Sequence, residues 1–203
     1  YKAVLIQSQA EHHKCAAIFG IGRTGGTSEL LTLFSAASNL SPTLRAAGKE
    51  TLINLKDKPG NLFVRQLNID ERLLRMYEQA EPFKKAVLLE VISARKSPDA
   101  DKLVLAATND VTTEVRQAAY QILSQQNNMD STFLETTLQK ASRDPKPEIR
   151  EVGIKGLLRI AEARLATGNK EAASRLYVEV LELATGRDTK AAALRGLTLA
   201  ANK

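Results

Sequence analysis

The stretches Arg116-Gln-Ala-Ala-Tyr-Gln-Ile-Leu123 and Arg150-Glu-Val-Gly-Ile-Lys-Gly-Leu157 share one pattern. Each begins with a basic residue, followed three positions later by a small or apolar residue and seven positions later by a large aliphatic residue. Four further copies begin at Lys14, Arg45, Lys85 and Lys190. Successive copies are 31, 40, 31, 34 and 40 residues apart. Periods in this range are typical of arrays of stacked helical repeats.

The composition favours helices packed closely on one another. Hydrophobic residues make up 43% of the 203 residues and charged residues 26%, whereas aromatic residues make up only 4% and Trp is absent. Ala and Leu dominate, and both favour the helical conformation. The length suits one or two ordinary domains, or one solenoid with a continuous core.

Each copy of the pattern is interpreted as the second of two helices, which we call the B helix, after a first, outer A helix. The predicted B helices cover residues 11–22, 41–55, 82–96, 112–126, 146–165 and 187–203. We therefore predict an all-α, right-handed α–α superhelix of about six helix pairs, in which the B helices line the inner, concave face. Residues 1–203 are expected to form a single domain. A loop is predicted to be inserted at residues 56–68, where turn-forming residues are concentrated.

The two most regular linkers, Asp110–Arg116 and Asp144–Arg150, have Asp, then Glu four positions later, an aliphatic residue and Arg. With the small residue and the Leu that follow, they resemble HEAT repeats of the short bacterial kind. The segment Phe19–Leu31 resembles the glycine-bearing turn between successive helix pairs of that family. This resemblance implies an armadillo-like solenoid with an extended surface, and so a protein–protein or interdomain binding or scaffold module.

A finer similarity concerns Leu158–Tyr177 and Lys190–Leu197, which look like the end of HEAT-like modules in large bacterial exported proteins. Such modules often neighbour a sugar-processing domain, for example of the keto-disaccharide hydrolase type. The resemblance therefore implies, as an alternative, an accessory module of a carbohydrate-processing enzyme whose catalytic domain lies outside this chain. It also implies a periplasmic or exported location, which the composition does not indicate. Because the chain begins at Tyr1 and not at Met, we expect a piece of a larger protein or a processed product.

The charged residues are distributed unevenly between the predicted helices. The predicted B helices contain 17 Lys and Arg residues against 8 Asp and Glu residues, whereas the rest of the chain contains 12 against 15. We therefore predict a net basic concave face, and the candidate binding residues are Lys84, Lys85, Arg95, Lys155, Arg159, Lys190 and Arg195. An ordinary solvated face with local neutralisation is the competing interpretation. A basic face also suits nucleic acid or another polyanion, as in HEAT-like DNA glycosylases, although few aromatic residues are present for base stacking.

The recurrent arginines Arg45, Arg116 and Arg150 are predicted to set the register of the array. In a stacked array such guanidinium groups can bond carboxylates or helix-end carbonyl groups of neighbouring repeats. Asp110 and Asp144 are predicted to cap B helices or to pair with these arginines.

No motif in the sequence indicates catalysis, a cofactor or a metal ion. Gly20–Gly25 spells the dinucleotide-binding G-x-G-x-x-G, but the segment before it fits a helix better than the required strand, so a glycine-bearing turn is predicted at Gly22–Gly26. His12 and His13 are adjacent, so their side chains diverge on a helix, and Cys15 adds only one ligand. HEAT-like bilin lyases show that this fold can host enzymes. Because no reactive site is recognisable, we nevertheless predict that the chain is not an enzyme, has no cofactor and contains no transmembrane span.

Overall fold

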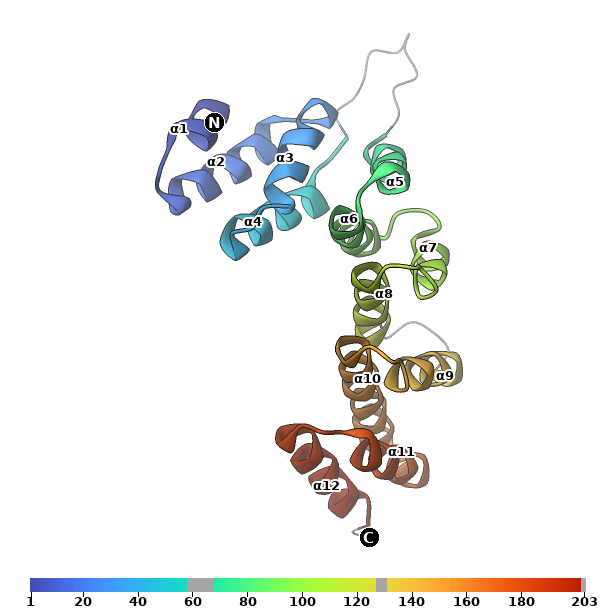
Figure 1. Ribbon diagram of the computed structural model, residues 1–203. Coiled ribbons are helices and arrows are strands. Elements are labelled where there is room, and N and C mark those ends of the chain that lie inside the picture. Colours follow the sequence, from blue (N-terminus) through green and yellow to red (C-terminus); the bar gives the residue numbers. More distant parts are fainter. Residues whose placement is uncertain (58–67, 127–130, 202–203) are drawn as a thin grey trace. The chain divides into compact units, whose positions relative to one another are not determined.

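The computed structural model describes residues 1–57, 68–126 and 131–201, and in these ranges all regular structure is helical (Figure 1). The α-helices are α1 (Lys2–Gln7), α2 (Glu11–Thr24), α3 (Leu30–Ala37), α4 (Pro42–Asn54), α5 (Ile69–Gln79), α6 (Pro82–Ala94), α7 (Ala100–Ala107), α8 (Thr113–Gln125), α9 (Ser131–Ser142), α10 (Pro147–Ala166), α11 (Lys170–Leu183) and α12 (Arg187–Ala201). A 3₁₀ turn, η1 (Thr27–Glu29), precedes α3. None of the helices in these ranges is both long enough and apolar enough to cross a membrane.

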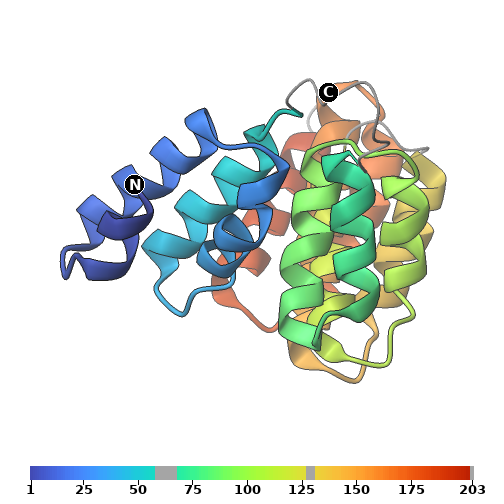
Figure 2. The ribbon, with the colours of Figure 1, turned by 90° about the horizontal axis from the view of Figure 1, so that it is seen from above.

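The chain forms two compact units, residues 1–106 and residues 107–203. In the first unit the B helix α2 packs on α4, and α4 packs on α6; Figure 2 shows α2 and α4 lying side by side. In the second unit α8 packs on α10, and α10 packs on α12. The single domain over residues 1–203 stays a prediction. The predicted inserted loop at 56–68 falls almost entirely on residues 58–67, outside the described residues.

The predicted B helices agree with the observed ones to within a few residues, but the predicted turn at Gly22–Gly26 is wrong in its first half. Helix α2 continues to Thr24, whose Oγ1 donates a 2.9 Å hydrogen bond to the carbonyl oxygen of Gly20, one turn back. The glycines at 20 and 22 are therefore interior residues of a helix. What requires a small residue at Gly22 is packing, because a Cβ there would overlap the methyl group of Thr51 in α4.

The repeated pattern forms the core. The residues three positions after its basic residue are buried in every copy: Ala17, Gly48, Leu88, Ala119, Gly153 and Ala193. The residues seven positions after it are buried in the first five copies: Ile21, Leu52, Ile92, Leu123 and Leu157. In the sixth copy Leu197, in α12, is partly exposed. Each fully buried aliphatic side chain stabilises the fold by about 1.5–3 kcal/mol relative to exposure.

Two of the glycines bring an A helix and its B helix into backbone contact. A Cβ added to Gly48 in α4 would overlap the backbone nitrogen of Ala37 at the end of α3. A Cβ added to Gly153 in α10 would overlap the backbone nitrogen of Ser142 at the end of α9. The same close approach thus recurs in both units at the same pattern position.

Candidate functional site

A groove of about 490 Å³ lies between the neighbouring B helices α8 and α10 in the second unit. Helix α8 contributes Gln117, Gln121, Ser124 and Gln125, and helix α10 contributes Glu148, Glu151, Val152, Lys155, Gly156 and Arg159. The pattern begins at Arg116 in one helix and at Arg150 in the other, so the two helices present matching positions to each other.

The first unit has a groove of its own, of about 450 Å³, between α2 and α4; we call it the first groove, and the groove between α8 and α10 the second groove. Its lining residues are Phe19, Gly22, Arg23, Gly25, Glu50, Thr51, Asn54 and Lys56. Counted from the basic residue of each pattern, positions five and nine line both grooves. In the first unit these positions hold Phe19, Arg23, Glu50 and Asn54, and in the second they hold Gln121, Gln125, Lys155 and Arg159. The repeat architecture therefore builds the same groove twice with different side chains.

A glycine sets the depth of each groove, although the two glycines lie on opposite helices. In the first unit Gly22 of α2 receives the methyl group of Thr51 from α4. In the second unit Gly156 of α10 faces Ser124 of α8, whose Cβ would lie 3.2 Å from an added Cβ. Gly22 and Ser124 lie eight positions after the basic residue of their patterns, and Thr51 and Gly156 lie six positions after theirs. The glycine therefore belongs to the first helix of the pair in one unit and to the second helix in the other.

The structure places two of the sequence-predicted binding residues, Lys155 and Arg159, in the groove of the second unit. It also gives them internal partners. The Nζ of Lys155 lies 2.6 Å from a carboxylate oxygen of Glu151, and Nη1 of Arg159 donates a 2.8 Å hydrogen bond to the carbonyl oxygen of Ser124. The groove therefore carries charges of both signs.

The other predicted binding residues lie elsewhere. At the start of α6, Lys84 pairs with Glu81 at 3.5 Å, and the Nζ of Lys85 lies 5.4 Å from the centre of the Tyr77 ring. Lys190 and Arg195 are exposed on α12. The net basic concave face stays a prediction. Three of its predicted cations, Lys84, Arg95 and Lys155, form ion pairs with carboxylates nearby.

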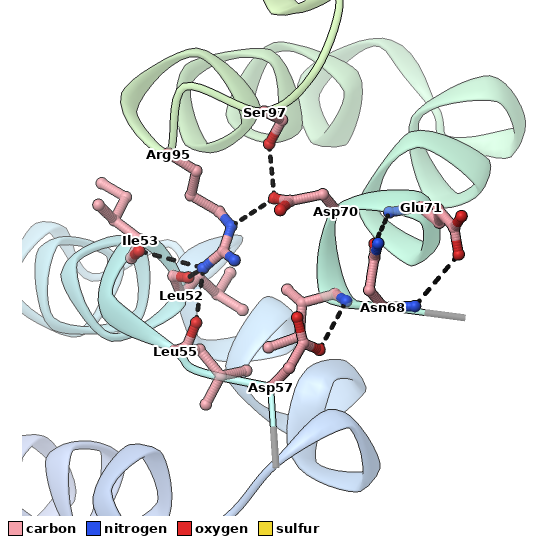
Figure 3. Close-up of polar contacts among 10 residues, drawn as sticks. Leu52, Ile53, Leu55, Asp57, Asn68, Asp70, Glu71, Arg95 and Ser97 are labelled. Carbon is pink, nitrogen blue, oxygen red and sulfur yellow. Dashed lines mark hydrogen bonds and ion pairs between the residues drawn. The ribbon is translucent and has the colours of Figure 1, made fainter. Parts of the chain in front are cut away.

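Arg95, also predicted as a binding residue, makes internal contacts with three helix-end carbonyl groups (Figure 3). Its Nη1 donates to the carbonyl oxygens of Leu52, Ile53 and Leu55 at 2.8, 3.1 and 2.8 Å. Its Nε lies 2.7 Å from a carboxylate oxygen of Asp70, and only 10% of its side chain is exposed. The guanidinium group thus satisfies carbonyl groups at the end of α4, and we leave Arg95 out of the proposed binding surface.

Asp70, the carboxylate partner of Arg95, belongs to the first turn of α5. Ser97 Oγ donates to the same carboxylate oxygen at 2.6 Å. Burial opposes ionisation of this carboxyl group, but the hydrogen bonds from Arg95 and Ser97 outweigh it and lower the pKa of Asp70.

At the start of α5, Asn68 and Glu71 form a reciprocal capping box (Figure 3).

The predicted register arginines each bond two carbonyl groups of the turn before their own helix, and not helix-end carbonyl groups of a neighbouring repeat, in the same way in both units. Arg45 donates to the carbonyl oxygens of the residues six and five positions before it, at 2.9 and 3.0 Å. Arg116 does so at 2.9 and 3.2 Å, and Arg150 at 3.0 and 2.9 Å. These acceptors belong to the turn that leads into the arginine's own B helix. Each arginine therefore fixes how the A helix connects to the B helix.

Asp110 and Asp144 act in these turns, but not as helix caps. Their Oδ1 atoms accept hydrogen bonds from the backbone N–H two residues later, at 2.9 Å from Thr112 and 2.8 Å from Lys146, before the helix begins. Aspartate favours such local turns because its short carboxylate reaches the backbone nearby. Asp144 Oδ2 also lies 3.8 Å from Nε of Arg116, a residue of the preceding B helix.

Sequence reasoning missed the glutamines of α8. Gln117, Gln121 and Gln125 follow one another at four-residue spacing on the face opposite the buried Ala119 and Leu123. The signal was present in the sequence, because residues one, five and nine positions after the pattern's basic residue share one helix face. Charge counting overlooked it because a carboxamide is neutral.

The geometry of the G-x-G-x-x-G segment also differs from a phosphate-binding loop. Gly20 and Gly22 lie inside α2, and no strand precedes them in the described part of the chain. At the start of the same helix, the rings of His12 and His13 meet edge to face with centres 4.2 Å apart. Within the described residues, no three His, Cys, Asp or Glu side chains are grouped so as to hold a metal ion.

Comparisons with known proteins find a similar fold but no family assignment. No family model matches the sequence, and a search of curated proteins finds no match. Among solved structures, a chain from the complex of CpcE and CpcF of phycocyanin lyase from Nostoc sp. PCC7120 superposes with a TM-score of 0.56 at 18% identity. The match covers 83% of this chain and 98% of that chain. The fold is an all-α solenoid of helical repeats. The predicted fold class is confirmed, whereas the finer similarity to modules of exported proteins stays a prediction.

The same comparison contradicts the prediction that the chain is not an enzyme. That prediction depended on the lack of a familiar catalytic motif. The structural neighbour has the same fold and is part of a lyase, so the lack of such a motif does not exclude chemistry on this scaffold.

Proposed function

We propose that this chain is a helical-repeat module that binds a segment of a partner protein or neighbouring domain in the grooves between its B helices. The observation that carries the proposal is the repetition of the groove. Both units form it, at the same pattern positions, with glycine at the crossing point. The scaffold positions of the pattern are buried, whereas the groove positions are polar or aromatic and accessible to a ligand.

The structural neighbour supports a protein as the partner, since its fold occurs there in a complex of two proteins. The charges of the second groove also favour a protein over a nucleic acid. Glu148 and Glu151 line one end of that groove and would repel phosphate groups. A mixed-charge groove suits a polypeptide, which carries side chains of both signs.

The test is selection of peptides from a random library on the 203-residue chain, followed by affinity measurements with two variants. Gln121→Trp fills the middle of the second groove, and Glu182→Trp places the same ring on the exposed surface of the A helix α11 as the matched control. We expect that many of the selected peptides bind Gln121→Trp at least about tenfold more weakly than the unsubstituted chain. The same peptides should bind the control variant as tightly as the unsubstituted chain. Selected peptides that bind both variants equally, or a library that yields no binder, would refute the proposal for this groove.

A labelled single-stranded oligonucleotide provides the competing test. Tight binding that weakens steeply with salt and is lost in Gln121→Trp would replace the protein partner by a polyanion.

A further inference from the structure

The second groove has a wall of regularly spaced carboxamides. Gln117, Gln121 and Gln125 lie one helical turn apart on α8, so their Cα atoms are separated by about 6 Å. None of the described residues forms a side-chain hydrogen bond with these three carboxamides. Each carboxamide offers two donor hydrogens and one acceptor oxygen, the same groups that pair with a peptide backbone.

This spacing matches an extended polypeptide lying along the groove. Two residues of an extended chain advance about 6.6–6.8 Å, close to one helical turn, and every second residue presents its backbone groups to the same side. Over three glutamines the two repeats drift apart by only about 1–2 Å, which flexible glutamine side chains can follow. A helical ligand would not suit this wall, because its backbone groups are bonded internally.

On the opposite wall, from α10, the acidic residues come before the basic residues along the helix. Glu148 and Glu151 come first and Lys155 and Arg159 last, with Val152 between them. The outermost charges, Glu148 and Arg159, mark the two ends of this wall by their position, and Glu151 and Lys155 pair with each other between them. Eleven helical residues separate these two by about 16 Å, the length of about five residues of extended chain.

We propose that the groove between α8 and α10 holds an extended peptide segment that carries a basic and an acidic side chain four or six residues apart, the even separations nearest this length, which place both side chains on the same side of the chain. The basic side chain lies beside Glu148 and the acidic one beside Arg159, while alternate backbone amides bond the carboxamides of α8. The charge order of the groove fixes which end of the segment lies where along α10. This inference rests on the proposed function and names the chemical class of its ligand.

The first experiment measures fluorescence anisotropy of labelled ten-residue peptides on the full chain. One peptide has Lys and Glu four positions apart in a Ser/Val sequence, so that both side chains project to the same side of the extended chain. Two others have Lys at both positions or Glu at both. We expect the Lys/Glu peptide to bind about fivefold more tightly than either uniform peptide, the size of one exposed ion pair. In Glu148→Lys, where both ends of the groove are basic, the preference must move to the Glu/Glu peptide. Because residue 148 is exposed, the variant should fold normally.

The second experiment tests the backbone contacts. Two versions of the Lys/Glu peptide are N-methylated at alternate amides, one at the odd positions and one at the even positions. We expect one version to lose about tenfold or more in affinity, and Gln121→Met to abolish the difference between the two. The proposal is overturned if both versions bind as well as the parent peptide, or if Glu148→Lys leaves the charge preference unchanged. Library peptides that depend on the groove but lack the charge pair would contradict this inference alone and leave the proposed function intact.

Discussion

The groove of the first unit and the groove of the second unit are lined by the same pattern positions but by different side chains. Phe19 and Arg23 in α2 occupy the positions that Gln121 and Gln125 occupy in α8. In both units the residues three and seven positions after the pattern's basic residue are buried, apart from Leu197 in the last copy. The comparison teaches that the pattern separates two tasks. Some positions hold neighbouring helices together, and the positions between them face the groove and set what it can bind.

In both units an arginine donates to a carbonyl group at or near the end of the preceding B helix, but the two arginine side chains differ greatly in burial. In the first unit Arg95 from α6 donates to carbonyl groups at the end of α4, with 10% of its side chain exposed. In the second unit Arg159 from α10 donates to the carbonyl oxygen of Ser124 near the end of α8, but it is exposed. The same contact should therefore contribute very differently to stability.

The largest expected effect follows from this difference. Arg95→Met removes a nearly buried cation, and it leaves the Asp70 carboxylate and the carbonyl groups at the end of α4 without their donor. We expect a loss of about 3 kcal/mol in unfolding free energy. Arg159→Met, the matched control, should cost less than about 1 kcal/mol. Urea unfolding measures both, and hydrogen exchange should locate the Arg95 effect in residues 42–55. Equal losses in the two variants would show that burial does not distinguish the two arginines.

The Arg95 contact also has a pH dependence of known sign. The pKa of Asp70 is lowered in the folded protein, so its contribution to stability is present above the unfolded-state pKa of about 3.9 and is lost as pH falls through the lower folded-state value. Asp70→Asn should therefore remove part of the acid destabilisation that the unsubstituted protein shows below about pH 4. An acid unfolding profile that keeps its shape in Asp70→Asn would assign that loss to other carboxyl groups.

The next effect tests whether the two units pack an A helix on a B helix in the same way. Gly48→Ala and Gly153→Ala each place a methyl group against the backbone at the end of the preceding A helix. We expect each to destabilise by about 1–3 kcal/mol. Helix propensity alone predicts the opposite sign, since Ala is favoured over Gly by about 1 kcal/mol. Gly186→Ala, where an added Cβ meets only Thr189 Oγ1 at 3.7 Å, is the control and should stay within about 0.5 kcal/mol. Stabilisation in either unit would mean that the close approach is absent there.

The helices and their pairing could be predicted from the sequence because the repeated pattern records which face of each B helix is buried. The roles of single polar residues could not. Arg95 was predicted as a binding residue, since nothing near it in sequence indicates that it meets carbonyl groups 40–43 residues earlier. Gly22 was predicted to lie in a turn, because its close neighbour Thr51 lies 29 residues later in the chain. Local patterns therefore gave the scaffold, whereas contacts between repeats decide which exposed residues remain accessible for binding.

A smaller effect should come from exchanging the two forms of the groove crossing. Gly22→Ser alone creates an overlap with Thr51 and should cost about 1–2 kcal/mol. Adding Thr51→Gly reproduces the arrangement of the second unit and should show a favourable coupling of at least about 1 kcal/mol in a double-mutant cycle. The mirror exchange, Gly156→Thr with Ser124→Gly, should recover little, because an added Cβ at Gly156 also meets Leu138 at 2.8 Å. If both exchanges were rescued equally, the two crossings would be interchangeable and Leu138 would not restrict the second.

The smallest effect is expected at the groove positions themselves. Lys155 and Glu151 form an exposed pair one turn apart, with 61% and 66% of their side chains accessible. Lys155→Gln should therefore change the unfolding free energy by no more than about 0.5 kcal/mol. A thermal or urea unfolding curve checks this directly. A loss above about 1 kcal/mol would place Lys155 among the residues that hold the helices together, and the separation between scaffold and groove positions would then fail in the unit where the binding proposal is most specific.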